Sequence, residues 1–447
     1  MKYYKQVIPE KLDIKIKEIE KCPPKIPGFR MSFLKQIIYW ICTKKEENGY
    51  SYLNMKYLRT QIPQAEQYIR FLLAEEIIER TNGYIPGERS YGYRIAIKYE
   101  SKYIVTNVTD QKLIRKIEET PRKFAWGFSV QNKYIQDFTI DPQAIKFAEN
   151  NYSGESYNSA IVSINMANNG EKYSLIDNAG GRFYSPLTNM PSGLRQFVRV
   201  KDRYLKANVD IRNSQPYFSI MILTNPKEVA RFTKCKDLAM ILKNLYVSDN
   251  YDIKLYIELV TNGKFYEYLI PYFEAKKLIS TDLSPKEKRS SVKEQVMKIL
   301  FDRNRPRLSR AKKIFRALFP TVSEIFSIVR GIFGGERFPI LLQAIEAHVI
   351  LKVIIPILNN RHPDIICFTV HDSILVTDNP EVVEGVMTEE LTKYTGYSPI
   401  LKTELFALNE FSPQSITNQS KGEGESGREE STGEAEYYYG SKTSVIN

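Results

Sequence analysis

The sequence predicts an α+β protein in which helices accompany an antiparallel sheet and a winged helix-turn-helix precedes both. Three observations support this fold class. Apolar runs flank a polar turn at residues 365–376, which is typical of a β-hairpin. Residues 284–301 carry the start signals and the spacing of a capped helix. Residues 30–100 contain three helical patterns followed by a two-stranded pattern.

The N-terminal pattern begins with a helix predicted at Phe33–Cys42, since its apolar residues recur on one helical face. A short second helix is predicted at Asn54–Thr60 and a third at Gln64–Ile78. Arg80–Ile97 predicts a two-stranded wing rich in glycine, arginine and tyrosine: Gly83, Gly87, Arg89, Tyr91, Tyr93 and Arg94. We expect this region to bind duplex DNA. The alternative is packing against the rest of the chain or against another protein.

Residues 101–175 are less informative. A stretch of mixed charge from Lys112 to Lys123 is followed by three aromatic residues, Phe124, Trp126 and Phe128. By its position, this segment is predicted to be a connecting or thumb-like region.

Two aspartates lie where predicted strands end. Asp210 closes a short strand and is followed by a polar turn, and Asp372 lies in the turn Val370-His371-Asp372-Ser373. Mg²⁺ takes one or two carboxylates together with water and substrate phosphates. Paired carboxylates therefore suit two Mg²⁺ ions, with Mn²⁺ as an alternative, in phosphoryl or nucleotidyl transfer. The competing interpretation of Asp372 is an ordinary β-turn residue.

The helix predicted at residues 285–301 combines an N-cap signal with a charged stripe. Ser284, Pro285 and Glu287 match a capping box with proline at the first helical position. Four residues spaced by four share one face: Arg289, Lys293, Met297 and Phe301. The polar start of this stripe suits a triphosphate, and its apolar end suits a base and sugar. A surface helix with a solvated basic edge is the alternative.

Taken in order, these elements resemble the palm and fingers of family A DNA polymerases and of phage-type single-subunit RNA polymerases. Asp210 in Asp-Ile-Arg-Asn-Ser-Gln is similar to the first sequence block of the family, and Val370-His371-Asp372 is similar to the third. The stripe Arg289–Phe301 resembles the second block. Upstream, Asp177–Tyr184 is similar to the Gly-Arg element that contacts the primer–template. Leu342–Glu346 resembles the helix whose Gln touches the primer terminus.

The resemblance implies a right-hand polymerase with an antiparallel palm sheet and helical fingers. It assigns metal binding to Asp210 and Asp372. It assigns triphosphate binding to Arg289 and Lys293, with Lys293 as proton donor to the pyrophosphate. The remaining implied contacts are Met297 and Phe301 to the nucleotide, and Arg182, Gln343 and His371 to the primer–template.

The chain also departs from the family. Ser373 and Met297 match the RNA polymerases rather than the DNA polymerases, and no glycine follows Phe301. A bulky residue near the 2′ position of the incoming nucleotide excludes ribose in this family, and the candidates here are Gln215 and Tyr217. Both are large, whereas RNA polymerases have glycine, and Phe301 lacks the hydroxyl that recognises ribose. A missing hydrogen-bond partner can decide substrate selection, so DNA synthesis is favoured.

Charge and composition agree with a polyanionic partner. The formal net charge is +12, and the basic run from Arg303 to Arg316 follows the predicted nucleotide helix directly. We expect phosphate contacts from its arginines, Arg303, Arg305 and Arg307. The four cysteines lie far apart in the sequence, which argues against a zinc site or a disulfide framework.

The predicted organisation has four parts. They are an N-terminal winged helix-turn-helix at 1–100, a connecting or thumb-like region at 101–175, a polymerase palm and fingers at 176–411, and a disordered tail at 412–447 rich in Gly, Ser and Glu. The N-terminus lacks the apolar core of a signal peptide. No stretch of about 18 apolar residues predicts a membrane span, so a cytoplasmic location without membrane contact is expected.

The leading hypothesis is a template-directed nucleotidyltransferase: an exonuclease-free DNA polymerase of a phage, plasmid or other mobile element. No acidic run resembles a 3′–5′ exonuclease. Its expected partners are a DNA primer–template, nucleoside triphosphates and replication proteins. A single-subunit RNA polymerase or primase is the first alternative. A non-catalytic DNA-binding replication factor is the second.

Overall fold

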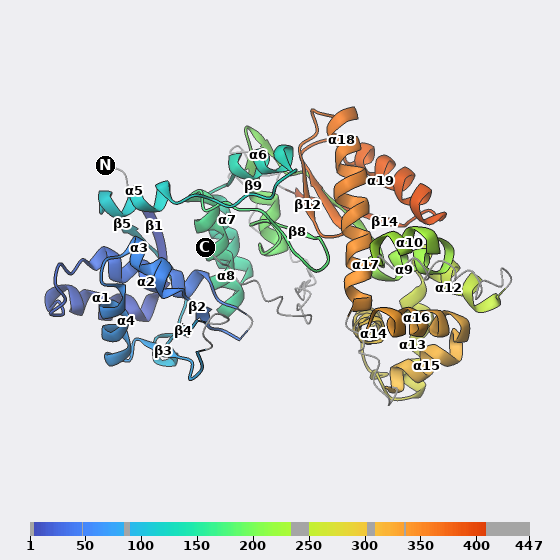
Figure 1. Cartoon of the computed structure of the whole chain (residues 1–447), viewed down its shortest axis with the longest axis horizontal. Coiled ribbons are helices and arrows are strands. Elements are labelled where there is room, and N and C mark those ends of the chain that lie inside the picture. Colours follow the sequence, from blue (N-terminus) through green and yellow to red (C-terminus); the bar gives the residue numbers. More distant parts are fainter. Residues whose placement is uncertain are drawn as a thin grey trace, which may run out of the picture. The chain divides into compact units, whose positions relative to one another are not determined.

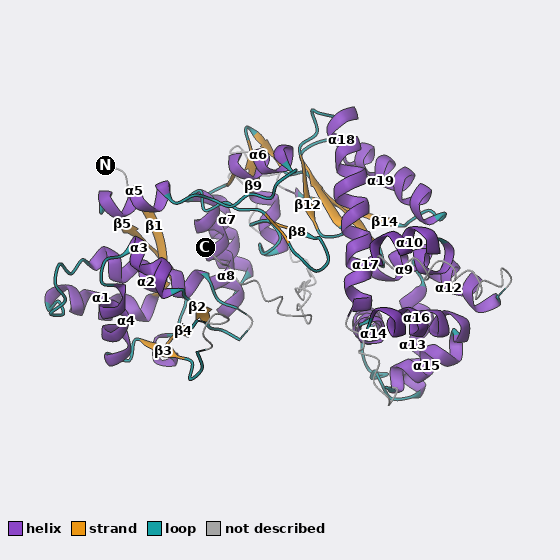
Figure 2. Ribbon diagram, in the orientation of Figure 1, coloured by secondary structure: helices purple, strands orange, loops and turns teal. Residues whose placement is uncertain are grey.

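The computed structural model describes residues 4–46, 48–84, 90–233, 250–301, 309–334 and 337–407. It has a helix-rich α+β fold with small antiparallel sheets (Figures 1 and 2). Two compact units divide the chain. Unit 1 contains Met1–Ser174 and Ser185–Tyr204, and unit 2 contains Leu175–Tyr184 and Leu205–Ser412.

The first half of unit 1 contains a three-stranded sheet of order β2-β4-β3 with three helices. Its elements, in chain order, are α2 (Met31–Thr43), β2 (Ser51–Tyr52), α3 (Met55–Gln61), α4 (Ala65–Ala74), β3 (Ile78–Arg80) and β4 (Gly92–Ile95). The helix predicted at Phe33–Cys42 is confirmed as α2. The third predicted helix is too long, because Ile78 begins β3 and pairs with Ile95. Of the predicted wing residues, Gly87 and Arg89 lie outside the described residues.

Strand β1 (Tyr4–Pro9) and strand β5 (Tyr103–Val108) pair antiparallel and join the two halves of unit 1. The division predicted at residue 100 stays a prediction, although this pairing crosses it. Behind the strands, the carboxylate of Glu171 accepts hydrogen bonds from the hydroxyls of Tyr4 and Tyr39. The other elements of unit 1 are α1 (Glu10–Lys21), η1 (Ile97–Tyr99), α5 (Gln111–Glu119), α6 (Ser129–Asp137), β6 (Phe138–Ile140), α7 (Gln143–Asn151), α8 (Gly154–Asn168), η2 (Ser192–Phe197), β9 (Val198–Val200) and β10 (Arg203–Tyr204).

Unit 2 is built on a four-stranded antiparallel sheet of order β12-β13-β11-β14. Its strands are β11 (Ala207–Ile211), β12 (Cys367–Val370), β13 (Ser373–Val376) and β14 (Leu401–Leu405). Every residue of β12 and β13 is buried, as expected for continuous apolar strands. A separate two-stranded hairpin is formed by β7 (Leu175–Ile176) and β8 (Phe183–Tyr184).

Helix α9 (Ser214–Thr224) follows β11 and is buried from Ser214 to Leu223, so it is the central helix of unit 2. Around Tyr256 a cluster of aromatic rings fills the helical half of the unit: Phe265, Phe315, Phe319 and Phe326. The other helices are α10 (Pro226–Thr233), α12 (Tyr251–Thr261), α13 (Phe265–Ala275), α14 (Pro285–Leu300), α15 (Arg310–Leu318), α16 (Pro320–Phe333), α17 (Arg337–His348), η3 (Val349–Ile354), α18 (Ile355–Arg361) and α19 (Pro380–Thr395).

Segments α17, η3 and α18 form one continuous helix, Arg337–Arg361, with a π-helical middle (Figure 1). Pro356 follows the π-helical segment, and its ring nitrogen cannot donate to the preceding turn. Within the described residues, this is the one helix long and apolar enough to cross a membrane. The expectation that the sequence holds no such stretch is therefore wrong. Since 56% of its most apolar window is buried inside the protein, its length and composition equally fit a core helix.

A distant carboxylate caps helix α16. The N-cap residue Phe319 has no side chain able to accept a hydrogen bond, and Pro320 follows it. Instead, Oδ2 of Asp252 accepts the backbone N–H groups of Thr321 and Val322 at 2.8 and 3.2 Å. This contact ties α12 to the start of α16.

Asp252→Ala should lower the free energy of unfolding by about 1–2 kcal/mol, because two N–H groups at a helix start lose their acceptor. Urea unfolding of the full chain measures this. Glu324→Ala is the matched control, since it removes an exposed carboxylate from α16 itself. Equal stability losses in the two variants would contradict the capping role of Asp252.

Candidate active site

The hairpin β12–β13 turns through His371 and Asp372, because Val370 pairs with Ser373 across the loop. His371 adopts a positive φ of 54°, as the first residue of a favoured two-residue hairpin loop must. The sequence predicted a turn at His371-Asp372-Ser373, because Asp and Ser side chains can bond their own backbone. Ser373 contributes through its Oγ, which donates to the Val370 carbonyl at 3.0 Å. The strained backbone conformation, however, is taken by His371.

The two predicted metal-binding aspartates lie at the same end of the sheet. Asp210 is the direct partner of Ser373 in the β11–β13 register, and Asp372 precedes Ser373 in the loop. Both aspartates are half-buried. Residues 162 positions apart in sequence are thus brought next to each other by strand pairing.

The loop between β7 and β8 is folded around Asp177. The Asp177 carboxylate accepts the backbone N–H groups of Ala179, Gly180 and Arg182. Gly180 faces helix α17 so closely that a Cβ would lie 2.9 Å from the Cβ of Gln343. Only glycine fits this approach. The predicted Gly-Arg element and the predicted Gln helix are therefore in contact.

Glu346, one turn after Gln343 on α17, is the centre of a buried polar network. Its side chain has no exposed surface. Nε and Nη2 of Arg182 donate to Oε1 at 2.9 and 2.6 Å. Ser214 Oγ and Gln215 Nε2 donate to Oε2 at 3.3 and 2.5 Å. One carboxylate therefore joins the β7–β8 hairpin, the start of α9 and helix α17.

The electrostatics of this network extend to the hairpin turn. Burial raises the pKa of Glu346 to about 7. The positive charge of Arg182 lowers this pKa in part, and the negative charge of Asp372 raises it further. Burial lowers the pKa of Arg182, but Glu346 and Asp372 reverse this and leave it raised. Arg182 is thus held between two carboxylates, one on α17 and one in the β12–β13 loop.

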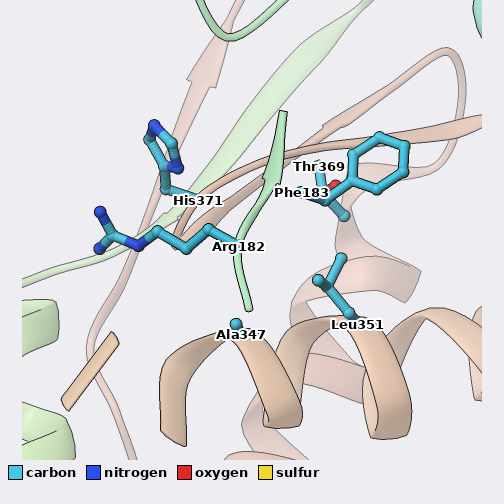
Figure 3. Close-up of a pocket in the computed structure, with 6 residues that line it drawn as sticks. All are labelled: Arg182, Phe183, Ala347, Leu351, Thr369 and His371. Carbon is cyan, nitrogen blue, oxygen red and sulfur yellow. The ribbon is translucent and has the colours of Figure 1, made fainter. Parts of the chain in front are cut away.

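A pocket beside this network is lined by Arg182, Phe183, Ala347, Leu351, Thr369 and His371. In Figure 3 the side chains of Arg182 and His371 extend toward one side, and the apolar side chains of Phe183 and Leu351 lie toward the other. The His371 ring also meets the edge of the Tyr184 ring, with centroids 5.3 Å apart. The predicted primer–template residues Arg182, Gln343 and His371 thus lie on adjoining elements.

Helix α14 begins as predicted. Ser284 is its N-cap, and Ser284 and Glu287 form a reciprocal capping box. Arg289, Lys293 and Met297 are half-buried on one face, and Phe301 is buried at the end. The end of α14 is held by Arg330 of α16, which donates to the carbonyls of Ile299 and Leu300 at 2.8 and 3.2 Å.

Arg289 connects α14 to the turn after Asp210. Its Nη2 donates to Asn213 Oδ1 at 3.2 Å, and its Nε donates to Glu267 Oε1 at 2.9 Å. Its guanidinium also lies over the Tyr266 ring, 5.0 Å from the centroid. Asn213 is itself in the left-handed region, with a φ of 59°, at the start of α9. The hydrogen bond from Arg289 to Asn213 places the start of the α14 stripe beside the strand that carries Asp210.

Gln215 and Tyr217, the two sugar-gate candidates, face different neighbours. The Tyr217 hydroxyl lies 2.8 Å from Thr395 Oγ1 and donates to the Tyr397 carbonyl at 2.7 Å, so it is bonded to the end of α19. Gln215 bonds to Glu346, and its amide oxygen has no partner among the described residues. Gln215 therefore belongs to the network beside Asp372, and Tyr217 does not.

The basic run and the metal ligands are the two remaining parts of the predicted site. Arg303, Arg305 and Arg307 lie outside the described residues. In the described parts of the chain, no group of three His, Cys, Asp or Glu side chains is placed to hold a metal ion. The pair Asp210 and Asp372 nevertheless fits Mg²⁺, which takes one or two carboxylates and completes its shell with water and phosphate.

No protein-family model and no curated protein matches the chain. Among solved structures, the chain is similar to the POL domain of Pol1 from M. smegmatis in complex with DNA primer-template and dNTP. The identity is 14%, the TM-score is 0.36, and the match covers 58% of this chain and 50% of that one. The chain spans half the length of that structure, and a likeness at this level decides neither fold nor activity.

Three charged residues that organise the site were given no role from the sequence: Glu346, Glu267 and Arg330. Glu346 carried a signal, because a lone acid within the apolar stretch 338–351 is typical of a buried, paired charge. Its donors lie 131 to 164 residues away in sequence. Glu267 and Arg330 carried no comparable signal.

Glu346 should make stability depend on pH. Its pKa is raised above the ordinary value of 4.5 to about 7, so the unfolded chain releases this proton first as pH rises. The free energy of unfolding should therefore fall between about pH 4.5 and pH 7, by up to about 3 kcal/mol. Urea unfolding across this range, comparing wild type with Glu346→Gln, measures the effect.

The difference in unfolding free energy between the two proteins should narrow or reverse across that window as the wild type loses stability. Glu390→Gln is the control, since Glu390 is also buried in unit 2 but bonds to Lys393 on its own helix. A constant difference from pH 4.5 to pH 7 would show that Glu346 does not titrate there.

Proposed function

We propose that the chain is a template-directed nucleotidyltransferase, an exonuclease-free DNA polymerase that uses two Mg²⁺ ions. One observation carries the proposal. Asp210 and Asp372 lie at one end of an antiparallel sheet, and Arg289 links the turn after Asp210 to the α14 stripe. A carboxylate pair beside a cationic helix face suits a nucleoside triphosphate with its metal ions.

In this proposal, the β11–β14 sheet is the palm, and α12 to α16 with α14 at their centre are the fingers. Asp210 and Asp372 hold the metal ions. Metal ions held by these carboxylates would supply Lewis-acid activation of the primer 3′-hydroxyl and stabilise the charge of the leaving pyrophosphate. Asp210 sits on paired backbone, and Asp372 lies in a two-residue turn closed by the pairing of Val370 with Ser373. Both carboxylates are thus placed before substrate binds, which favours an in-line attack.

The helix α14 orients the nucleotide. Arg289 and Lys293 bind the triphosphate, and Lys293 donates a proton to the pyrophosphate as it leaves. Met297 and Phe301 contact the base and sugar. Glu267 and Asn213 hold the Arg289 guanidinium in a fixed direction, so less ordering is needed when the nucleotide arrives.

Primer and template contacts come from Arg182, Gln343 and His371, and the basic run with Arg303, Arg305 and Arg307 contacts phosphates.

The α2–β4 region acts as a winged helix-turn-helix that binds duplex DNA. Its order of helices and strands, with β4 between β2 and β3, supports that role. The region 101–175 connects it to the polymerase or forms a thumb, and 412–447 is a tail. We place the protein in the cytoplasm, serving a phage, plasmid or mobile element.

Gln215 is the sugar gate in this proposal. The bond to Glu346 fixes its amide, whereas the Tyr217 hydroxyl is already satisfied by α19. A small RNA polymerase or primase is the second candidate, because Met297 and Ser373 match that branch of the family.

Primer extension with dNTPs and Mg²⁺ tests the activity. Asp210→Asn or Asp372→Asn should lower synthesis by at least about 100-fold, because a neutral amide binds the cation poorly. Asp364→Asn is the control, since Asp364 is an exposed aspartate just before the same hairpin. Full synthesis by Asp372→Asn, or no synthesis by the wild type with either dNTPs or NTPs, would refute the proposed function.

Gln215→Ala should raise NTP incorporation relative to dNTP incorporation by about 10-fold or more, since a smaller side chain admits the 2′-hydroxyl. Single-nucleotide kcat/KM for dATP and ATP gives this ratio. Ser219→Ala provides a buried substitution one turn further along α9 and should leave the ratio unchanged. A wild type that already prefers ATP would favour the RNA polymerase or primase, and an unchanged ratio would exclude Gln215 as the gate.

A further inference from the structure

The two tryptophans of the chain have opposite surroundings. Trp40 on α2 is 6% exposed and belongs to the core, whereas Trp126, between α5 and α6, is 96% exposed. An indole buries a large apolar area when it finds a partner and contributes strongly to binding interfaces. A fully exposed indole therefore needs an explanation that a scattered exposed leucine does not.

The backbone directly before Trp126 is hydrogen-bonded to two other segments of unit 1. The Lys123 carbonyl accepts the backbone N–H of Ser174 at 3.0 Å, and the Ala125 N–H donates to Ser174 Oγ at 2.8 Å. Asn132 Nδ2 donates to the Ala125 carbonyl at 2.7 Å, and Asn132 Oδ1 accepts from Ser174 Oγ at 2.6 Å. The backbone before Trp126 is thus fixed to two other segments of unit 1. Gly127 then turns the chain with a φ of 82°.

The sequence around Trp126 is basic. Residues 120–136 contain three basic residues, Arg122, Lys123 and Lys133, and no acidic residue. Lys123 and Lys133 are exposed, Arg122 and Phe124 are half-buried, and Phe128 is buried. A protein-binding site would surround the indole with an apolar core, which this loop does not provide. A positively charged loop with one fully exposed aromatic side chain suits single-stranded nucleic acid.

We propose that Trp126 is a stacking platform for an unpaired base of single-stranded nucleic acid, with the exposed Lys123 and Lys133 contacting the neighbouring phosphates. Because the backbone before Trp126 is already fixed, binding would order the indole side chain but little of the loop. The site lies in unit 1 and requires no metal ion, nucleotide or catalysis. It therefore stands or falls independently of the proposed polymerase activity.

Fluorescence titration of the full chain without Mg²⁺ tests the proposal. A 12-nucleotide oligo(dA) should quench the emission of Trp126 and shield it from iodide. An abasic 12-mer with the same phosphates should do neither. Oligo(rA) of the same length distinguishes DNA from RNA: a larger effect with one assigns the preferred strand, and equal effects assign the shared base-stacking chemistry.

Trp126→Leu should weaken oligo(dA) binding by about 5- to 100-fold, the contribution of one stacked base, with little change for the abasic strand. Trp126→Phe should restore part of the affinity, because a phenyl ring still stacks. Quenching by the abasic strand equal to that by oligo(dA), or an unchanged oligo(dA) affinity in Trp126→Leu, would overturn the proposal. Self-association that Trp126→Leu abolishes, with DNA affinity unchanged, would assign the indole to a protein contact instead.

Discussion

Strand β11 pairs with β13 on one side and β14 on the other, and the site depends on the register of these two ladders. The pairing of Asp210 with Ser373 sets one aspartate beside the turn that carries the other. A slip of one residue would send the side chain of Asp210 to the opposite face of the sheet. Burial of Val209 and Ile211 on either side of Asp210 fixes the register, because a slip would expose both.

One carboxylate in each unit gathers several hydrogen-bond donors: the fully buried Glu346 and the half-buried Glu171. In unit 2, Glu346 gathers Arg182, Ser214 and Gln215, and in unit 1, Glu171 gathers the hydroxyls of Tyr4 and Tyr39. A buried ion pair contributes little net stability, because desolvation offsets much of the attraction. A buried carboxylate instead fixes the orientation of its donors, because each donor must point at one of the same two oxygens. The orientation of Arg182 and Gln215 is thus the main product of burying Glu346.

Features with local causes were predictable from the sequence. The capping box of α14 needs only Ser284 and Glu287 and formed as predicted, and the apolar runs around Asp372 formed the predicted hairpin. Features that depend on distant partners were not. No residue near Glu346 in the sequence indicates that Arg182 is its partner. Likewise, no residue near Pro320 indicates that Asp252 caps helix α16. The turn at His371-Asp372-Ser373 formed as predicted, but its left-handed residue, His371, is set by loop length and strand twist rather than by a local sequence signal.

The path of the chain between units has a consequence for how this protein can be divided or evolve. Residues 175–184 belong to unit 2, although the segments on both sides of them belong to unit 1. A fragment beginning at Leu205 would contain both aspartates and α14 yet lack Arg182. Glu346 would then lose the guanidinium that it binds and keep only the neutral donors Ser214 and Gln215. Unit 2 therefore cannot be exchanged by cutting the chain at residue 205 alone. A recombination that replaces it would also have to keep residues 175–184 with it.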